Sequence, residues 1–205
     1  MRGRRGAVRS TRAVLALGLL ALAGCGSSRP TTSSSAIPPS LLREVRPIGV
    51  GPRFQPPPRG SVVGACRSRL GARDGVHVEV FAENRVVIVA AGIGTRGPRT
   101  RLDGGITAAR CYGAIVTLEP TGVVLVRRGL RLTLAQLFRA WGQPLSPTRV
   151  ASFAAPAGTR VAVFLDGRRV AGPPGSVVLA RHAEIVVEVG PHVPPHSSFA
   201  FPPGI

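Results

Sequence analysis

Two groups of histidine and carboxylate side chains are spaced so that they could act together. His77 and Glu79 alternate along one apolar stretch, and His182, Glu184 and Glu188 alternate along another. A strand points every second side chain to the same face, so each group would line one face of a sheet. Imidazoles and carboxylates gathered at one place can ligate a divalent cation such as zinc. Polar residues with this spacing also line the solvent side of half-exposed strands. We adopt that interpretation and expect no metal site; His77, Glu79 and His182 are the candidate ligands if one exists.

The chain lacks a complete set of catalytic residues. Its four His and nine carboxylates leave few groups for acid–base work, and no G-x-S-x-G motif is present. Residues 92–97 match the dinucleotide-binding pattern G-x-G-x-x-G, but Pro98 follows where a phosphate site needs the start of a helix. We interpret this segment as a loop. We therefore expect that the protein is not an enzyme, with no catalytic residue and no cofactor.

The first 25 residues are organised like an export signal. Five Arg precede an apolar run at residues 13–23. As a helix, that run would be roughly 16 Å long, about half of the ~30 Å hydrocarbon core of a bilayer, so it is too short to span a membrane. The sequence LAGC at residues 22–25 resembles the lipobox of bacterial lipoproteins. The resemblance implies that residues 1–24 are a cleaved signal peptide and that Cys25 carries diacylglycerol, which anchors the protein to a membrane. An ordinary secretory signal with a coincidental Cys is the alternative.

Two cysteines remain once Cys25 is assigned to lipid. An even pair in an oxidising compartment is typical of a disulfide, so we predict a bond between Cys66 and Cys111. In the chain-entropy model such a bond stabilises the fold by at most about 4 kcal/mol. A metal-binding pair or a catalytic thiol is the alternative, although no His lies near either Cys in the sequence.

Composition divides the rest of the chain into three parts. Residues 25–60 are rich in Pro and Ser and cannot bury enough apolar surface to offset the entropy of ordering. We predict that they form a tether, with a strand at residues 41–50 as the alternative. Residues 61–190 have the pattern of a globular domain. Residues 191–205 form a Pro-rich tail, in which we expect His192 and His196 to be unordered.

The charge of the chain is strongly positive. It has 27 basic and 9 acidic residues, a formal charge of +18, and every basic residue is Arg. Five Arg precede Cys25, so the mature chain would have 22 Arg against 9 acidic residues, a charge of +13. The absence of Lys is typical of GC-rich codon usage, and the Arg residues are scattered rather than gathered into a stripe. We expect no specific nucleic-acid partner; weak, salt-dependent binding to envelope polyanions is the alternative.

One amphipathic helix stands out between hairpins. Leu134, Leu137, Phe138 and Trp141 follow the i, i+3, i+4, i+7 spacing of a single apolar stripe. Thr133 with Gln136 makes a capping box, and Gly142 and Pro144 end the helix. Alternating apolar residues predict strands at 76–81, 86–89, 114–118, 123–126, 161–165, 168–170, 177–179 and 185–189. The sequence thus predicts a β-rich, single α+β domain of several hairpins with one short helix. We expect a β-grasp-like layout, with a β sandwich as the alternative.

Residues 61–205 also resemble a family of largely uncharacterised exported bacterial proteins. The family has a Cys, an H-x-H-x-H segment, a second Cys, an L-H-T-H-D-x-x-G-I-I-H-V-E hairpin and a T-L-G-Q-F-F-x-x-W-G helix. In this chain Cys66, Cys111 and TLAQLFRAWG at 133–142 match in that order, followed by Asp166-Gly167 and residues 182–190.

The histidine-rich segments of the family suggest a divalent-metal site, and most of those histidines are missing here. In the H-x-H-x-H segment only His77 remains, because the first two positions are Arg73 and Gly75. The three hairpin histidines are replaced by Val116, Leu118 and Leu125, whose side chains cannot ligate a metal. The resemblance therefore implies a degenerate member that keeps the scaffold and lacks the metal site.

Together these features predict a lipoprotein anchored to the cell membrane on its extracytoplasmic face. The predicted role is non-catalytic, either in binding or in envelope structure. A metal-binding or redox lipoprotein that uses His77, Glu79 and His182 is one alternative, and a weak polyanion-binding surface protein is the other.

Overall fold

The computed structural model describes residues 47–205. The predicted signal peptide, Cys25 and most of the predicted tether lie outside the described residues. Within residues 47–205, no helix combines the length and the hydropathy needed to cross a membrane.

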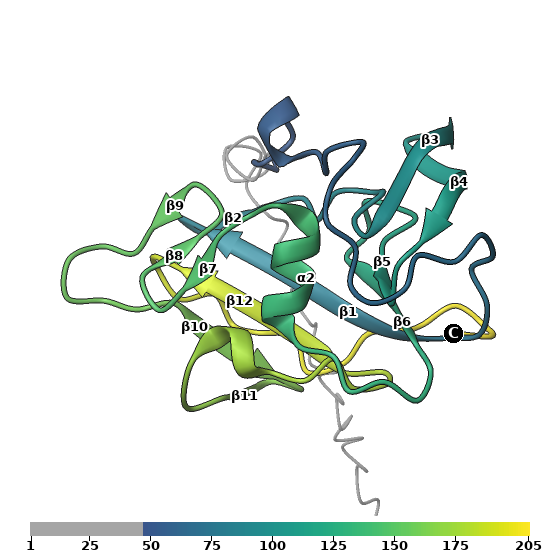
Figure 1. Ribbon diagram of the computed structural model, residues 1–205. Coiled ribbons are helices and arrows are strands. Elements are labelled where there is room, and N and C mark those ends of the chain that lie inside the picture. Colours follow the sequence, from purple (N-terminus) through teal and green to yellow (C-terminus); the bar gives the residue numbers. More distant parts are fainter. Residues whose placement is uncertain (1–46) are drawn as a thin grey trace, which may run out of the picture. The chain divides into compact units, whose positions relative to one another are not determined.

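A mixed sheet of seven strands forms the centre of the domain (Figure 1). Its order is β11-β10-β12-β1-β6-β5, and β2 also pairs with β1. The two central strands, β1 (Arg73–Ala82) and β12 (Glu184–Val189), run parallel, and the other pairs are antiparallel. The remaining strands of this sheet are β2 (Arg85–Val86), β5 (Ile115–Val116), β6 (Val123–Arg127), β10 (Ala162–Leu165) and β11 (Arg168–Arg169).

Helix α2 (Leu134–Trp141) lies across one face of this sheet (Figure 1). The backbone N–H of Thr133 donates to Gln136 Oε1 at 2.8 Å, and Gly142 ends the helix with a left-handed φ of 79°. All four residues of the predicted stripe are buried. They pack in one core cluster with alternate residues of the central strands, among them Val76, Val78, Val80, Ile185 and Val187. The predicted helix and its boundaries are confirmed.

The predicted β-rich α+β class is confirmed by this arrangement. A helix on one face of a sheet, with the first and last long strands parallel at its centre, agrees with the β-grasp-like layout. The predicted strand at 177–179 is wrong. It contains a single bridge, between Val178 and Thr133, and follows a 3-10 turn at Pro174–Ser176.

Two smaller sheets complete the domain, and the sequence analysis predicted neither of them. A hairpin joins β3 (Thr95–Leu102) to β4 (Gly105–Tyr112), and a three-stranded sheet contains β7 (Leu145–Ser146), β8 (Arg149–Val150) and β9 (Phe153–Ala154). The first hairpin turns at Asp103-Gly104, both with positive φ. This is a standard two-residue hairpin turn, but its flanking strands carry Arg and Thr in place of alternating apolar residues.

The described residues before position 61 pack against the domain, although the sequence assigned them to the tether. A 3-10 turn at Pro52–Phe54 buries Phe54, and the Phe54 carbonyl accepts a hydrogen bond from Trp141 Nε1 at 2.6 Å. Ile48 forms a parallel bridge with Val87. Apolar contacts and backbone hydrogen bonds thus attach residues 48–54 to the domain, although the segment is rich in Pro.

Candidate functional site

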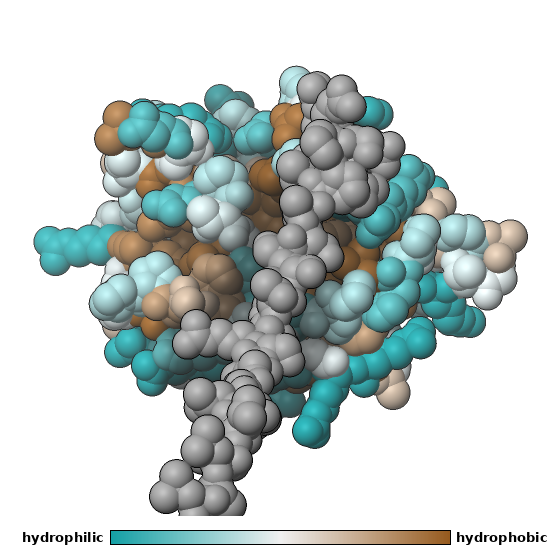
Figure 2. Space-filling model, turned by 180° about the vertical axis from the view of Figure 1, so that it is seen from behind, coloured by the Kyte–Doolittle hydropathy of each residue, from teal (hydrophilic) through white to brown (hydrophobic). Residues whose placement is uncertain are grey.

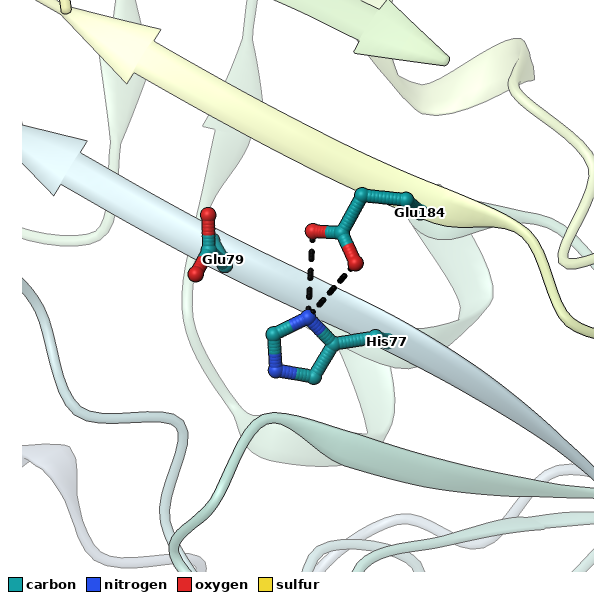
Figure 3. Close-up of side chains that lie close together, drawn as sticks. All are labelled: His77, Glu79 and Glu184. Carbon is teal, nitrogen blue, oxygen red and sulfur yellow. Dashed lines mark hydrogen bonds and ion pairs between the residues drawn. The ribbon is translucent and has the colours of Figure 1, made fainter. Parts of the chain in front are cut away.

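The parallel pairing of β1 with β12 brings three functional side chains to one face of the sheet. His77 lies opposite Glu184 in the register. Because side chains alternate along a strand, His77 and Glu79 share a face, and Val76 and Val78 point the other way into the core beneath α2. Figure 3 shows His77, Glu79 and Glu184 projecting from the two neighbouring strands.

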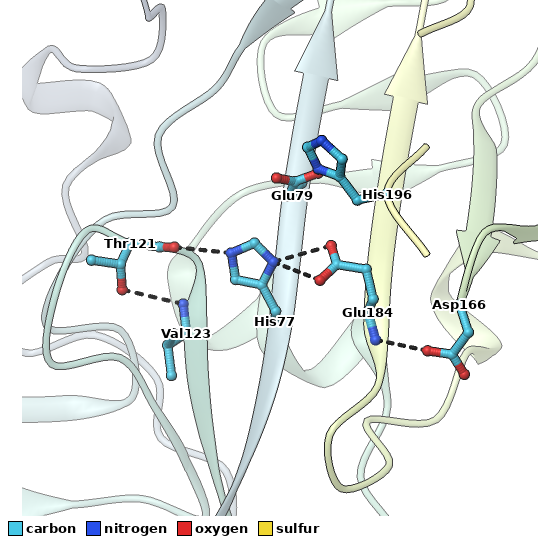
Figure 4. Close-up of polar contacts among 7 residues, drawn as sticks. All are labelled: His77, Glu79, Thr121, Val123, Asp166, Glu184 and His196. Atoms are coloured by element: carbon cyan, nitrogen blue, oxygen red, sulfur yellow. Dashed lines mark hydrogen bonds and ion pairs between the residues drawn. The ribbon is translucent and has the colours of Figure 1, made fainter. Parts of the chain in front are cut away.

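The imidazole of His77 is enclosed by oxygen acceptors. Its Nδ1 lies 2.8 Å and 3.0 Å from the two carboxylate oxygens of Glu184, and its Nε2 lies 3.1 Å from the carbonyl oxygen of Thr121 (Figure 4). A carbonyl oxygen can only accept, so Nε2 donates to Thr121, and an ionised Glu184 carboxylate requires that Nδ1 also carries a proton. With Glu184 ionised, the ring is an imidazolium, and His77 and Glu184 form an ion pair in which both residues are buried.

The pKa of His77 agrees with this protonation state. Burial alone lowers the pKa, but the hydrogen bond and negative charge of Glu184, the Thr121 carbonyl and the charge of Glu79 raise it. The net result is a pKa above the ordinary value of 6.5. Its surroundings thus favour the charged form of His77 more than water does.

Backbone and side-chain contacts fix both partners of the ion pair. Asp166 Oδ1 accepts a hydrogen bond from the backbone N–H of Glu184 at 2.9 Å. Gly122 has a φ of 82°, and a Cβ at this position would lie 2.8 Å from His77 Nε2. A side chain at position 122 would therefore collide with the imidazole. Glycine at this position lets the Thr121 carbonyl lie within hydrogen-bond distance of His77 Nε2.

The C-terminal tail covers the cluster. The ring of Phe199 stacks on the imidazole of His77, with centroids 3.8 Å apart and planes inclined by 11°. His196 Nδ1 lies 2.8 Å from Glu79 Oε2 (Figure 4). An aromatic face attracts a cation, so the charged state of His77 strengthens this stacking.

The rest of the tail is also held by defined contacts. His192 Nδ1 lies 2.8 Å from Glu188 Oε2, and the ring of Phe201 stacks on that of His182 at 4.8 Å. On the face that Figure 2 shows, hydrophobic residues are visible in patches among hydrophilic ones. The expectation that His192 and His196 are unordered is therefore wrong, because carboxylates that project from the sheet bind both imidazoles.

The arrangement offers a set of ligands for a divalent cation. One ligand atom from each of His77, Glu79 and Glu184 lies within 4.8 Å of the others. The candidate His182 does not belong to this group, because its Nε2 donates to the carbonyl oxygen of Ile205 at 2.7 Å. The structure thus brings together two of the three ligands named from the sequence and adds Glu184.

The cysteines behave as predicted where the structure describes them. Cys66 and Cys111 form a disulfide with their Cα atoms 5.4 Å apart. Cys25 lies outside the described residues. Residues 92–94 form a turn, and residues 95–97 already belong to β3. No helix follows the segment, as expected, but the predicted loop covers only its first half.

The chain matches no protein-family model, and comparisons with curated proteins and with solved structures find no similar protein. The resemblance to exported bacterial proteins therefore stays a prediction.

The sequence analysis missed the role of Glu184, although it placed this residue on a common face with His182. Glu184 is 107 residues away from His77, and no local pattern encodes a parallel pairing over that separation. The roles of His196 and Phe199 were missed because Pro-rich composition was interpreted as disorder. A sheet face carrying three carboxylates was the available signal that imidazoles in the tail would find partners.

The pH dependence of stability tests the His77–Glu184 ion pair. A folded-state pKa raised above 6.5 stabilises the fold below pH 6.5, and this contribution is lost as the pH rises through the folded pKa. We predict that His77→Gln lowers the free energy of unfolding by about 3 kcal/mol at pH 6, because it leaves a buried carboxylate without its counter-ion. The difference from wild type should shrink towards pH 9.

Denaturant unfolding at pH 6, 7.5 and 9 measures this difference. His192→Gln is the matched control: it also removes an imidazole from a carboxylate, but the His192 side chain is 61% exposed, so water can take its place beside Glu188. A difference that stays constant with pH, or that His192→Gln reproduces, would contradict the ion pair.

Proposed function

We propose that this protein is an extracytoplasmic lipoprotein that presents a non-catalytic binding domain from the cell membrane. The observation that carries the proposal is the distribution of the three cysteines. Cys66 and Cys111 are joined in a disulfide, which is typical of an oxidising compartment. Cys25 then remains as the one thiol available for a lipid, directly after the apolar run of the predicted export signal.

The way in which His77, Glu79 and Glu184 are enclosed supports a binding role over a catalytic one. A general base needs a free lone pair, and both nitrogens of His77 face acceptors. The Phe199 ring also lies against the imidazole. Residues enclosed in this way stabilise a fold or hold a ligand, and they are poorly placed to exchange protons with a substrate.

Mass spectrometry of the mature chain tests the anchor. We predict that the N-terminus of the mature protein is Cys25 with a diacylglyceryl group, and that the protein stays in the membrane fraction after a high-salt wash, because two acyl chains anchor stably. Cys25→Ser should leave residues 1–24 attached and abolish the lipid mass. As a control, Cys66→Ser with Cys111→Ser should keep the lipid. An unmodified Cys25, or cleavage at another position, would contradict the proposal.

Binding of a divalent metal is a second candidate function, favoured by the convergence of His77, Glu79 and Glu184. One imidazole and two carboxylates suit zinc, and the His196 imidazole in contact with Glu79 is a nearby fourth donor. In this function the cation would replace the proton between His77 and Glu184 and would fasten the tail to the sheet.

A zinc titration tests this candidate. The full-length chain, purified in a neutral detergent and freed of metal, should bind one zinc ion per chain, and Glu79→Gln should weaken binding by about tenfold or more. Glu79 is the preferred position because its carboxylate lies at the edge of the ion pair, so the fold should tolerate the change. His192→Gln should bind zinc like wild type. No binding, or equal binding by wild type and Glu79→Gln, would contradict metal binding at this cluster.

A further inference from the structure

A second charged feature lies away from the His77 cluster. Four arginines surround an open hollow of about 750 Å³. Two of them belong to the loop that follows Cys66, and the other two end β6 and begin the next turn. The hollow is lined by Arg67, Ser68, Arg69, Leu70, Gly71, Ala72, Arg127, Arg128 and Leu130.

A fifth arginine lies beneath this surface. Arg73 is 4% exposed and lies directly opposite Arg127 in the β1–β6 register. Its guanidinium donates to carbonyl oxygens, including that of Gly113 at 2.8 Å and that of Ala114 at 3.1 Å. Like charges facing each other across two strands are destabilising, and carbonyl groups solvate a cation without neutralising it.

The positive charge of this region has little compensation from acidic groups. Within residues 47–205, the ion pairs include none between a carboxylate and Arg67, Arg69, Arg73 or Arg127. Asp74, the acidic residue next to Arg73, contacts Arg128 at 2.9 Å and Arg181 at 3.8 Å. Arg67, Arg69 and Arg127 therefore meet around the hollow without a negative partner from the described chain.

The electrostatics of Arg73 agree with an excess of positive charge. Burial, followed by the charges of Arg127 and Arg67, lowers the pKa of Arg73 to about 10. Burial and the charge of Arg67 also lower the pKa of Arg127. Each cation is thus destabilised by its neighbours, and an anion placed among them would relieve that repulsion.

We propose that this hollow binds the phosphate group of a phosphate-bearing anion. A guanidinium presents paired N–H donors that match two oxygens of a phosphate, and several guanidinium groups around one hollow can share its oxygens. The Cys66–Cys111 disulfide holds the start of the loop against β4, and Arg127 Nη2 donates to the carbonyl oxygen of Ala65 at 3.1 Å. The loop that carries Arg67 and Arg69 is therefore fixed in place before the anion arrives.

The phosphate group could come from a membrane lipid headgroup or from a free phosphate ester. A headgroup carries a diester, and a free ester carries a monoester with greater negative charge. Glycerophosphoglycerol, the water-soluble headgroup of phosphatidylglycerol, and glycerol 3-phosphate therefore separate the two sources. The proposal does not depend on the lipid anchor or on metal binding.

Isothermal titration of the full-length chain in a neutral detergent tests the site with both compounds, at low salt and with sodium acetate as the ionic-strength control. Wild type should bind at least one of them, and the tighter of the two identifies the source. Arg67→Gln with Arg69→Gln should weaken binding about tenfold or more, because two charge-assisted contacts are lost. Both side chains lie on exposed residues, so these variants should fold normally.

Arg168→Gln with Arg169→Gln is the matched control. It removes the same charge from exposed residues of β11, outside the hollow. It should bind within about twofold of wild type, because it leaves all four arginines of the hollow in place and changes only the net charge. The proposal is overturned if wild type binds neither compound better than acetate, or if the control pair loses as much affinity as Arg67→Gln with Arg69→Gln.

Discussion

The parallel pairing of β1 with β12 is the constraint on which the rest of the structure depends. It aligns His77 with Glu184 on one face of the sheet, and on the other face it aligns the apolar residues that α2 covers. A shift of the register by one residue would turn His77 and Glu79 towards the helix and expose the core side chains. The buried ion pair and the apolar core therefore specify the same register from opposite faces.

Two buried cations in this fold are stabilised in different ways. His77 has a carboxylate, a carbonyl and an aromatic ring around it, so its charge is compensated within the chain. Arg73 has only carbonyl oxygens as hydrogen-bond acceptors and faces a second arginine. The positive charge of His77 is therefore balanced by a carboxylate of the same chain. Within residues 47–205 the positive charge of Arg73 is not, which is why we propose an external anion beside it. Buried charge alone would not have distinguished them.

The sequence predicted those parts of the fold that depend on local patterns. The stripe of Leu134, Leu137, Phe138 and Trp141, with its cap and its terminal glycine, was sufficient to define α2. The disulfide could be predicted because, once Cys25 is assigned to the lipid, Cys66 and Cys111 are the two cysteines that remain. The β3–β4 hairpin was missed because its strands carry arginines and threonines that leave no apolar alternation, even though Asp103-Gly104 marks the turn. The site could be predicted only in part, since the contact between His77 and Glu184 is set by strand order.

The protonation state of His77 in the metal-free protein tests this account most directly. Long-range ¹H–¹⁵N NMR correlations of the histidine rings report whether each ring nitrogen carries a proton. The account predicts that both Nδ1 and Nε2 of His77 are protonated at pH 7 and that this signal disappears in Glu184→Gln. A neutral His77 ring at pH 7, with one unprotonated nitrogen, would contradict the buried ion pair and the role assigned to the β1–β12 register.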